Sequence, residues 1–554
     1  MSNLVPSLLA VIARRSKARF LRKANQADLV QEQFLRSLLQ AHKDTELGRQ
    51  YGLANIYTID QFREQVPILP YSAYEPYIER TANGETNLLT AEPVVFFNMS
   101  SGSTGNRKLI PVTKRSRRMV ARANQTALGF VADAAKRDRL PIGTMLFTSP
   151  SKSLGYTNSG IPYGPISTSD LRLMGAIYRQ VFAYPFAALQ VADIAARHYL
   201  CLLFALRNSS LGVIGATFPV LALRLADYLE QYAQELIEDL ETGTIAPWLK
   251  LAPELRLQLE RQWQAYPTRA AELRQILQTE GRLTPKSAFP NLSFIVTARG
   301  GTSNFYLERF PDYFGNVPVF GGTYASSETV FGVHRDFNTD GVILAIESGF
   351  YEFLPEDQWQ AEHPQTLLPW QVKPGDRYRI LVTNYSGFYR YDIGDVVEVE
   401  GFCGKAPIFI FRHRLGGVIS STTEKTSEFH IMQTMQQLKQ EFNVSLENFC
   451  VTLSNDQIPP CYLLNIELAE GQVLPDPKQF LQRFDQILQN VHESYAVKRP
   501  DQVPSPRLRI LESGSFALVQ QRLVQRGANE TQLKFPHVSD DRNLLAGLKV
   551  EQEV

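Results

Sequence analysis

The sequence predicts an α/β protein with a large N-terminal domain of mixed β-sheets and helices and a smaller α+β C-terminal domain. Within residues 94–320, short apolar runs that end in Gly-rich or polar loops alternate with helical segments, which is typical of α/β layers. From residue 378 the chain is rich in strand-forming residues, and beyond residue 411 strand-like and helical runs follow one another. We therefore predict domains of residues 1–411 and 412–554.

Length and composition narrow the class of protein. A chain of 554 residues is long enough for several structural units, and we expect one large composite domain plus a smaller one. Its 57 basic and 56 acidic residues give a net charge of +1, which argues against a nucleic-acid partner. With 44% hydrophobic and 20% charged residues, the composition is that of a globular protein and excludes a disordered chain.

The N-terminal segment has two interpretations. Its apolar run, residues 4–13, precedes Arg14 and Arg15 instead of following them, which is the wrong order for a signal peptide. A helix with a basic face can dock on the protein body or lie on a membrane surface, and we favour the docked helix. The apolar stretch 199–223 is interrupted by Arg207 and Pro219, so we expect no transmembrane segment.

The elements follow from local patterns. Apolar residues recur at helical spacing in residues 26–42, and residues 223–281 are rich in Leu, Glu, Gln, Arg and Ala with few glycines; both segments are predicted helical, as are a helix starting near Thr113 and the run 477–494. Bulky apolar runs predict the strands 94–97, 292–296, 318–320, 379–383, 396–399, 449–453, 461–466 and 508–511. The four cysteines form no CxxC pair, so we predict neither disulfides nor a zinc site and a reducing, cytoplasmic location.

The first motif, Ser100–Lys108, directly follows a predicted strand. Its glycines permit close approach of the backbone to a phosphate, its hydroxyls supply donors, and Lys108 neutralises charge. The Lys is not followed by Ser or Thr, which argues against a P-loop NTPase. A plain surface turn has the same composition.

The second motif, Gly321–Glu328, also follows a strand. Tyr324 has the flat ring needed to stack on a base, and Glu328 has the carboxylate that Mg²⁺ prefers alongside substrate phosphates. A Gly/Ser turn followed by a capping glutamate is the alternative.

The third and fourth motifs lie near the predicted domain boundary. Tyr389–Asp395 is placed between strands, where Asp395 can accept both hydroxyls of a ribose, although a hairpin turn would also contain Gly-Asp. Arg412–Gly417, followed by Thr423–Glu428, supplies cations for phosphates and a Gly-Gly pivot.

In this order the four motifs resemble the adenylate-forming superfamily of acyl and aryl ligases, and more narrowly the acyl acid amido synthetases of the Gretchen Hagen family. The similar segments are Tyr324–Glu328 with Phe331-Gly332, Gly387–Arg390 leading to Gly394-Asp395, Ala406-Pro407, Glu424–Thr426 and Gln532–Pro536. In two places the sequence departs from the plant members: the first loop is one residue shorter, and one more residue separates Arg390 from Gly394-Asp395.

The resemblance implies roles for individual residues. Those implied to surround the phosphates are Ser100, Ser101, Ser103, Thr104 and Lys108. Those implied to line the adenylate pocket are Thr323, Tyr324, Ala325, Ser326 and Ser327, with Gly300 and Gly301 in an adenine-side loop. Glu328 is the implied Mg²⁺ ligand, Asp395 the ribose acceptor, Arg414 the hinge arginine and Lys425 the lysine that approaches the acyl adenylate.

The resemblance further implies a ligase that uses ATP and Mg²⁺, converts a carboxylic acid to acyl-AMP and passes the acyl group to an amino acid, with a mobile C-terminal domain. Coenzyme A as acceptor, or a non-catalytic nucleotide-binding protein, are the alternatives. We expect small-molecule substrates and a monomer. Neither the acid nor the amino acid is predicted; Arg115, Arg118 and Arg122 either pair with a carboxylate or form a solvated basic face, which we favour.

Overall fold

A computed structural model describes residues 4–101, 107–149, 153–164, 181–207, 209–301, 303–359, 361–414, 417–422, 424–500, 502–525 and 535–554. The chain divides into two compact units. The larger unit comprises residues 1–100, 108–393 and 397–411, and the smaller unit comprises residues 412–554 together with the short segments 101–107 and 394–396. None of the described helices is both long and apolar enough to cross a bilayer.

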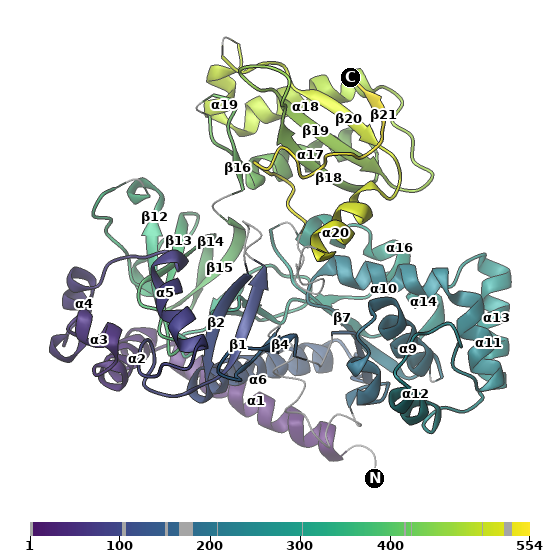
Figure 1. The fold of residues 1–554 in the computed structure, drawn as a ribbon, viewed down its shortest axis with the longest axis horizontal. Helices are drawn as coiled ribbons and strands as arrows, with labels where there is room; N and C mark the ends of the chain where they lie inside the picture. Colours follow the sequence, from purple (N-terminus) through teal and green to yellow (C-terminus); the bar gives the residue numbers. More distant parts are fainter. Residues whose placement is uncertain are drawn as a thin grey trace. The chain divides into compact units, whose positions relative to one another are not determined.

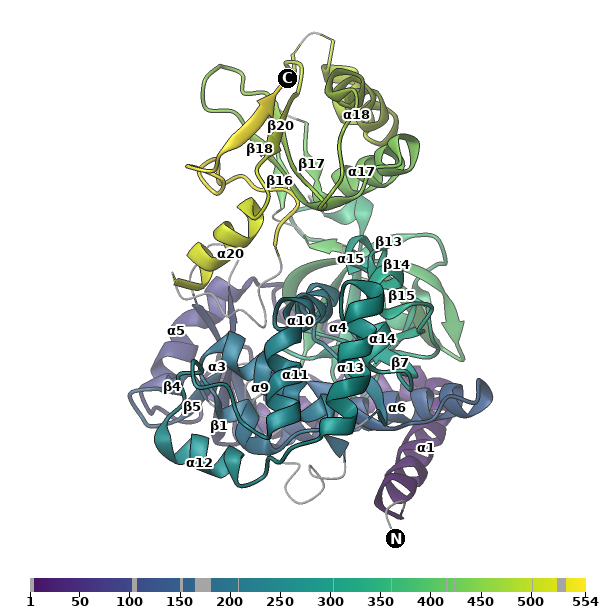
Figure 2. The same cartoon turned by 90° about the vertical axis from the view of Figure 1, so that its right-hand side faces the viewer.

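The N-terminal helix α1 packs along helix α6, as Figures 1 and 2 show. Gly129 of α6 allows this close crossing, because a Cβ at that position would lie 2.3 Å from the Ala13 carbonyl oxygen. Arg14 and Lys17 both pair with Asp133 of α6, at 2.8 and 2.7 Å. The predicted docking of a basic N-terminal helix on the protein body is therefore confirmed. The helices of this region are α1 (Leu4–Ala24), α2 (Ala27–His42), α3 (Glu46–Gln50), α4 (Ile59–Gln65), α5 (Tyr71–Ala82) and α6 (Lys114–Arg137).

A parallel sheet of order β3-β6-β7-β8 forms one layer of the larger unit. Its strands are β3 (Thr144–Phe147), β6 (Leu211–Gly215), β7 (Phe294–Val296) and β8 (Val319–Phe320). All of β6 is buried, as expected of a parallel strand covered on both faces. Strands β7 and β8 confirm two predicted runs, and each leads into a Gly-containing loop at its carboxyl end.

Helices account for the long segment between β6 and β7, as predicted for residues 223–281. Several begin with proline at the first helical position, where its missing N–H is tolerated. The helices between β3 and β8 are α9 (Ile194–Leu206), α10 (Pro219–Gln231), α11 (Ala233–Thr242), α12 (Pro253–Glu260), α13 (Pro267–Glu280), α14 (Pro285–Ala288), α15 (Ser303–Leu307) and α16 (Phe310–Phe314), with a 3₁₀ turn, η3 (Phe186–Gln190).

The first motif begins in the last two residues of one strand and ends in the first two residues of the next, in a second sheet of order β2-β1-β5-β4. This sheet contains β1 (Val94–Ser101), β2 (Arg107–Thr113), β4 (Gly155–Tyr156) and β5 (Pro162–Gly164). Helix α6 starts directly after β2 with Thr113 as its N-cap, in a capping box with Ser116. The predicted strand at residues 94–97 and the predicted helix start are both confirmed.

A seven-stranded sheet of order β12-β13-β14-β15-β11-β10-β9 completes the larger unit. Its strands are β9 (Thr323–Ala325), β10 (Val330–His334), β11 (Val342–Leu344), β12 (Phe350–Pro355), β13 (Arg377–Thr383), β14 (Tyr391–Cys403) and β15 (Ala406–Arg414). The third motif, Tyr389–Asp395, was predicted to lie between strands, and this prediction was wrong for its last five residues. Strand β14 begins at Tyr391 and continues through Asp395, with only Gly394 in the left-handed region at φ 79°.

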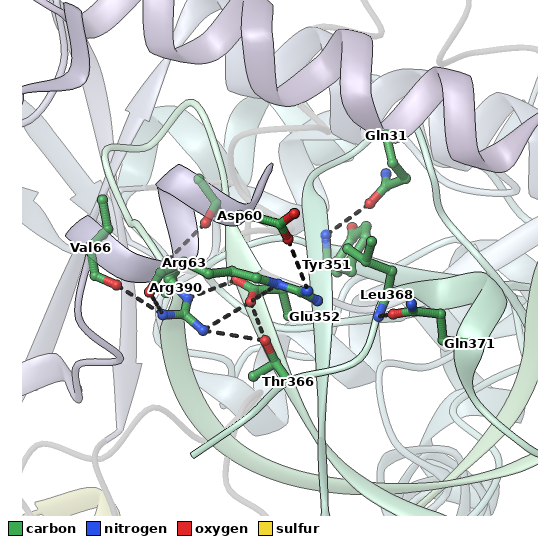
Figure 3. A network of polar contacts seen from close by, with 11 residues as sticks. Gln31, Asp60, Arg63, Val66, Tyr351, Glu352, Thr366, Leu368, Gln371 and Arg390 are labelled. Carbon is green, nitrogen blue, oxygen red and sulfur yellow. Dashed lines mark hydrogen bonds and ion pairs between the residues drawn. The ribbon is translucent and has the colours of Figure 1, made fainter. Parts of the chain in front are cut away.

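Beside this sheet, Arg390 and Glu352 form a buried ion pair (Figure 3). The guanidinium donates from Nε and Nη2 to the two carboxylate oxygens, both at 3.0 Å. Its Nη1 also donates to the carbonyl oxygens of Arg63 and Val66, and the Thr366 hydroxyl donates to Glu352. Buried charges are tolerated when every polar atom finds a partner in this way. Arg390, prominent in the third motif, is thus a structural residue.

The smaller unit is an α+β structure, as predicted. Its sheet has the order β18-β19-β20-β21, with β18 antiparallel and β20 parallel to β19. Helices α17 and α18 pack together beside the sheet (Figure 2). A two-stranded ribbon of β16 and β17 precedes α17. The elements are β16 (Val418–Ile419), β17 (Thr426–Ser427), α17 (Glu428–Phe442), β18 (Leu446–Leu453), β19 (Tyr462–Leu468), α18 (Pro477–Val491), α19 (Glu493–Lys498), β20 (Arg507–Leu511), α20 (Ser515–Gln525) and β21 (Val550–Glu553).

Candidate functional site

Tyr71 packs against the lysine of the first motif. The ammonium of Lys108, on β2, sits 5.0 Å from the centroid of the Tyr71 ring, within the range of a cation–π contact. Burial raises the pKa of Tyr71, and the Glu328 carboxylate adds to this increase. The Tyr71 side chain thus contacts the cation of the first motif, and the charge of the second motif's anion acts on its hydroxyl.

The Tyr71 hydroxyl forms two hydrogen bonds with the backbone of Leu109. The hydroxyl donates to the carbonyl oxygen of Leu109 and accepts from the Leu109 backbone N–H, both at 3.1 Å. Because Leu109 follows Lys108 on β2, these bonds fix the ring against the strand that carries the lysine.

Glu328 is held at three points in the turn between β9 and β10. Its N–H donates to the Ser326 hydroxyl at 3.2 Å, and its carbonyl oxygen accepts from the Asn384 side chain at 3.0 Å. The Tyr391 hydroxyl, at the start of β14, donates to the carboxylate oxygen Oε1 at 3.0 Å. These contacts leave the half-buried carboxylate in a defined orientation.

The loop before Glu328 is fixed by packing on one side and by hydrogen bonds on the other. Tyr324 stacks on Phe331 with centroids 5.2 Å apart and meets the Phe411 ring at 5.5 Å. The Asn98 side chain, on β1, donates to the Ser327 carbonyl oxygen at 2.9 Å. Strand β1, which leads into the first motif, is therefore joined directly to the second motif.

Thr323, Ala325 and Ser326 complete this loop. The Thr323 hydroxyl donates to the side-chain oxygen of Asn124 at 3.4 Å. The Ser326 N–H donates to the Thr329 carbonyl oxygen at 2.9 Å, closing the turn. Ala325 is exposed.

Gly300 and Gly301 form a strand-end loop after β7. Both adopt positive φ, 86° and 57°, a conformation in which glycine has no steric penalty. The Gly300 N–H donates to the Asn304 side chain at 3.2 Å, and Asn304 in turn donates to Asp340 at 2.7 Å. Arg299 also pairs with Asp340 at 3.0 Å. The Asp340 carboxylate therefore binds a residue on each side of the two glycines.

The remaining predicted residues of the first motif are only partly described. Ser103 and Thr104 lie outside the described residues. Ser100 and Ser101 form the end of β1, where the backbone alone is described.

In the smaller unit, Arg414 forms an ion pair with Asp395. The guanidinium Nε donates to Oδ1 of Asp395 at 2.6 Å. The aspartate side chain is 3% exposed and the arginine side chain 52% exposed, so a solvent-facing cation covers a buried anion. Lys425 lies in the connection between β16 and β17. It is exposed, whereas the preceding residue, Glu424, is buried.

Among the arginines of α6, Arg118 and Arg122 are exposed, as the predicted solvated face requires, whereas Arg115 is half-buried. Arg115 donates to the Tyr385 hydroxyl at 2.6 Å, and its guanidinium carbon lies 3.8 Å from the centroid of the same ring. The favoured interpretation of a solvated basic face was therefore wrong for Arg115, because an aromatic partner from β13's following loop reaches it.

Sequence reasoning assigned no role to Tyr71, Asn98 or Tyr391. Tyr391 stands inside the third motif, so its position carried a signal. Tyr71 and Asn98 carried none, since each contacts residues far along the chain. Within the described residues no three His, Cys, Asp or Glu side chains gather to hold a metal ion; the arrangement combines one carboxylate, one ammonium and stacked aromatic rings.

Three family models match the chain in order. They are described as the GH3 family N-terminal domain, central domain and C-terminal domain, and they match residues 16–319, 342–414 and 429–543. The first alone covers more than half of the chain.

Individual relatives agree with these matches. The chain is 26% identical to a probable indole-3-acetic acid-amido synthetase GH3.2 of Oryza sativa subsp. japonica, covering 92% of this chain and 88% of the relative. It is 26% identical to the indole-3-acetic acid-amido synthetase GH3.3 of Arabidopsis thaliana, covering 92% and 89%.

Solved structures show the same fold. The AtGH3.15 acyl acid amido synthetase in complex with 2,4-DB superposes with a TM-score of 0.85 at 23% identity, covering 98% of this chain and 97% of the other. A 2-hydroxyisobutyryl-CoA ligase in its postadenylation state gives a TM-score of 0.55 at 13% identity, with 93% and 90% coverage. The predicted fold class, with a large adenylate-forming unit and a smaller α+β unit, is confirmed.

Proposed function

Because the chain belongs to the GH3 family, we propose that it is an ATP-dependent acyl acid amido synthetase. In the first step the oxygen of a carboxylic acid attacks the α-phosphorus of ATP, which forms acyl-AMP and releases pyrophosphate. In the second, the amino nitrogen of an amino acid attacks the acyl carbon, which gives the amide, AMP and a proton. The indole-3-acetic acid-amido synthetases among its relatives support this reaction class.

The observations that carry the proposal are the contact of Lys108 with the Tyr71 ring and the Glu328 carboxylate oriented by the Tyr391 hydroxyl. Adenylation develops negative charge on the phosphates, and catalysis of such transfers consists mainly of positioning and charge stabilisation. A cation and an oriented carboxylate provide these elements, and no covalent nucleophile is required. Lys108 would neutralise the phosphates together with the hydroxyls of Ser100, Ser101, Ser103 and Thr104.

Nucleotide binding is proposed for the neighbouring loops. Tyr324 presents an aromatic ring held by Phe331 and Phe411, suited to packing against the adenylate. Thr323 and Ala325–Ser327 would line the same pocket, with Gly300 and Gly301 on the adenine side. Asp395 would accept the ribose hydroxyls, since an ionised carboxylate is an acceptor only.

Glu328 fits the proposed Mg²⁺ ligand. Mg²⁺ is usually bound by one or two carboxylates and substrate phosphates, without a protein cage, and a single half-buried carboxylate matches this pattern. The Tyr391 hydroxyl bonds Oε1 and thereby orients the group. When bound, the ion would supply charge neutralisation on the phosphates.

The domains of residues 1–411 and 412–554 are proposed to act together. Acyl-AMP hydrolyses when exposed to water, so closure of the C-terminal domain would protect it. Arg414 would act at the hinge, and Lys425 would approach the acyl adenylate. We further propose that the protein is a monomer and acts in the cytoplasm. Its free cysteines favour a reducing compartment of this kind.

Transfer to coenzyme A is the second candidate, favoured by the fold shared with a 2-hydroxyisobutyryl-CoA ligase. A catalytically silent nucleotide-binding protein is the third. The retained Lys108, Glu328, Asp395 and Lys425 argue against the silent alternative.

Mass spectrometry distinguishes these candidates. The protein would be incubated with Mg-ATP and pooled aromatic, indolic and fatty acids, with the twenty amino acids, with coenzyme A, or with neither. A product with the mass of acid plus amino acid minus water, accompanied by AMP, establishes the amido synthetase. A thioester without amide establishes the CoA ligase, and nucleotide binding without pyrophosphate release favours the silent protein.

A further inference from the structure

The ribbon β16–β17 presents Lys425 on a short loop of the smaller unit. Val418 pairs with Ser427 and Ile419 with Thr426, so the described residues of the loop between the two strands are 420–422 and 424–425, and Thr423 lies outside the described residues. Lys425 is exposed, whereas its neighbours Glu424 and Thr426 are each 0% exposed. A two-residue strand pair is too short to hold a loop by its own ladder, and the loop therefore depends on what lies beneath it.

Glu424 binds the loop from inside. Its Oε1 accepts from the Ser421 N–H at 2.5 Å and from the Tyr462 hydroxyl at 2.8 Å. Its Oε2 accepts from the N–H and the hydroxyl of Thr422 at 3.1 and 2.8 Å. One side chain thus ties the start of the loop to its end, immediately before Lys425.

The Glu424 carboxylate is buried without a cation. Within the part of the chain that the structure describes, no lysine or arginine forms an ion pair with it. Burial acts to raise its pKa, but the hydrogen bonds from Ser421, Thr422 and Tyr462 outweigh burial and leave the pKa lowered. The group is therefore ionised at neutral pH and acts only as an acceptor.

Tyr462 connects this loop to the central sheet. It is fully buried on β19, and its hydroxyl lies 2.8 Å from both Glu424 Oε1 and Thr426 Oγ1. A phenol has one proton, which Glu424 must receive, so the Thr426 hydroxyl supplies the second bond. Ser421 donates to the Pro460 carbonyl oxygen at 2.5 Å, which gives a second attachment beside β19.

His492 follows the carboxyl end of α18 and packs against α17. Its ring stacks on His430 with centroids 3.9 Å apart, and its Nδ1 accepts from the Tyr495 N–H at 3.4 Å. Burial lowers the pKa of His492, and the Lys425 backbone and the Glu424 carboxylate oppose that shift.

We propose that Glu424 and Tyr462 are positioning residues that hold the β16–β17 loop so that Lys425 is presented to the acyl adenylate. This inference rests on the proposed function, in which Lys425 acts on the reacting group. Burying a carboxylate costs free energy unless hydrogen bonds compensate, and the compensating bonds come from the loop itself and from Tyr462, directly before that lysine. Ordering of the lysine in advance lowers the entropy cost of reaching the reactive geometry.

The first test is a double-mutant cycle on pyrophosphate release, with Mg-ATP and an acid that the mass-spectrometric screen identifies. Glu424→Gln and Tyr462→Phe should each lower kcat roughly 10- to 100-fold, with KM for ATP changed less than about twofold. In the Lys425→Ala background the same substitutions should cost no further activity, because their effect passes through the lysine. An equal loss in both backgrounds, or no loss in the parent, overturns the proposal.

Glu467→Gln is the matched control. Glu467 is a 3% exposed glutamate of the same unit, and it accepts backbone N–H bonds from Gly514 and Phe516 at 2.6 and 2.9 Å. Its replacement should lower the melting temperature as Glu424→Gln does but leave kcat unchanged. A kcat loss equal to that of Glu424→Gln would show that any buried glutamate in this unit has the same effect, and would overturn the positioning role.

Hydrogen exchange measured by mass spectrometry tests the same inference without catalysis. Glu424→Gln and Tyr462→Phe should speed exchange at least about tenfold in peptides covering residues 418–427, while Glu467→Gln leaves those peptides unchanged. Unchanged exchange in both loop variants overturns the inference. If the parent protein releases no pyrophosphate with any acid, the proposed function fails, and exchange still reports whether the loop is held.

Discussion

Arg414 donates a hydrogen bond from its Nε to Oδ1 of Asp395 at 2.6 Å. The two residues lie on the adjacent strands β15 and β14, and the pair joins the proposed hinge arginine to the proposed ribose acceptor. The arginine side chain is 52% exposed, whereas that of Asp395 is 3% exposed. The cation is therefore half exposed to solvent, while the anion is buried.

Arg414→Ala should lower turnover roughly tenfold or more while the melting temperature changes little. The reason is that water hydrates and screens the half-exposed guanidinium, which limits what the ion pair adds to stability. Asp395→Asn should instead raise KM for ATP. Steady-state kinetics and thermal melts of both variants provide the measurement; a large melting shift in Arg414→Ala would point to a structural role.

Glu328→Gln should impair pyrophosphate release and raise the Mg²⁺ concentration that half-saturates it. The amide keeps the shape of the side chain but lacks the charge that a hard cation requires. Titration of Mg²⁺ at fixed ATP measures the effect, with Tyr391→Phe as a control that removes only the bond to Oε1. Adenylation close to the parent rate in Glu328→Gln would remove this residue from the metal role.

Tyr71→Leu should raise KM for ATP about 2- to 30-fold, the range that corresponds to losing a cation–π contact with Lys108. Tyr71→Phe keeps the ring and should keep KM close to that of the parent. It should nevertheless lose about 1 kcal/mol of stability, because the bonds to Leu109 disappear. Equal KM values in the Leu and Phe variants would contradict a role for the ring.

Glu352→Ala should destabilise the protein by about 3–5 kcal/mol, since it leaves the buried Arg390 without its carboxylate. Urea denaturation measures this loss. Arg36→Ala is the comparison, because its ion pair with Glu32 joins side chains 70% and 51% exposed. That variant should lose about 0.5 kcal/mol or less, and similar losses in the two variants would show that the buried pair is dispensable.

Stability should fall as the pH is lowered from about 6.5 to about 4. Burial, assisted by Arg115, lowers the pKa of His42 from 6.5 to about 4, and burial lowers that of His334 to about 4. Between these values the unfolded chain binds protons that the folded chain excludes, and each residue can contribute roughly 3 kcal/mol. Urea unfolding across this range should give a shallower pH dependence for His42→Gln; an identical slope would contradict the prediction.

Part of this protein could be predicted from its sequence because local patterns encode it. The strands before the first two motifs, the helix capped by Thr113 and the α+β character of the C-terminal segment all follow from periodicity and capping residues. The order of the motifs also identified the family. These features depend on residues within a few positions of one another.

The structure corrected predictions where distant residues compete with local preference. Tyr389–Asp395 contains the Gly-Asp of a turn, but pairing with neighbouring strands extends β14 through it. Arg390 of the same motif had no predicted role, and its buried ion pair with Glu352 is formed with a residue 38 positions earlier in the chain. The neighbouring strands and Glu352 all lie outside the motif, so the motif alone does not predict these interactions.

The sequence by itself therefore determined the fold class, the family and the residue types available for chemistry. Only the tertiary structure placed Tyr71 beside Lys108, paired Arg414 with Asp395, and set Glu424 beneath the loop of Lys425. The physical reason is that hydrophobic periodicity and backbone propensity act over a few residues. A contact between side chains tens or hundreds of residues apart depends instead on the path that the whole packed chain takes.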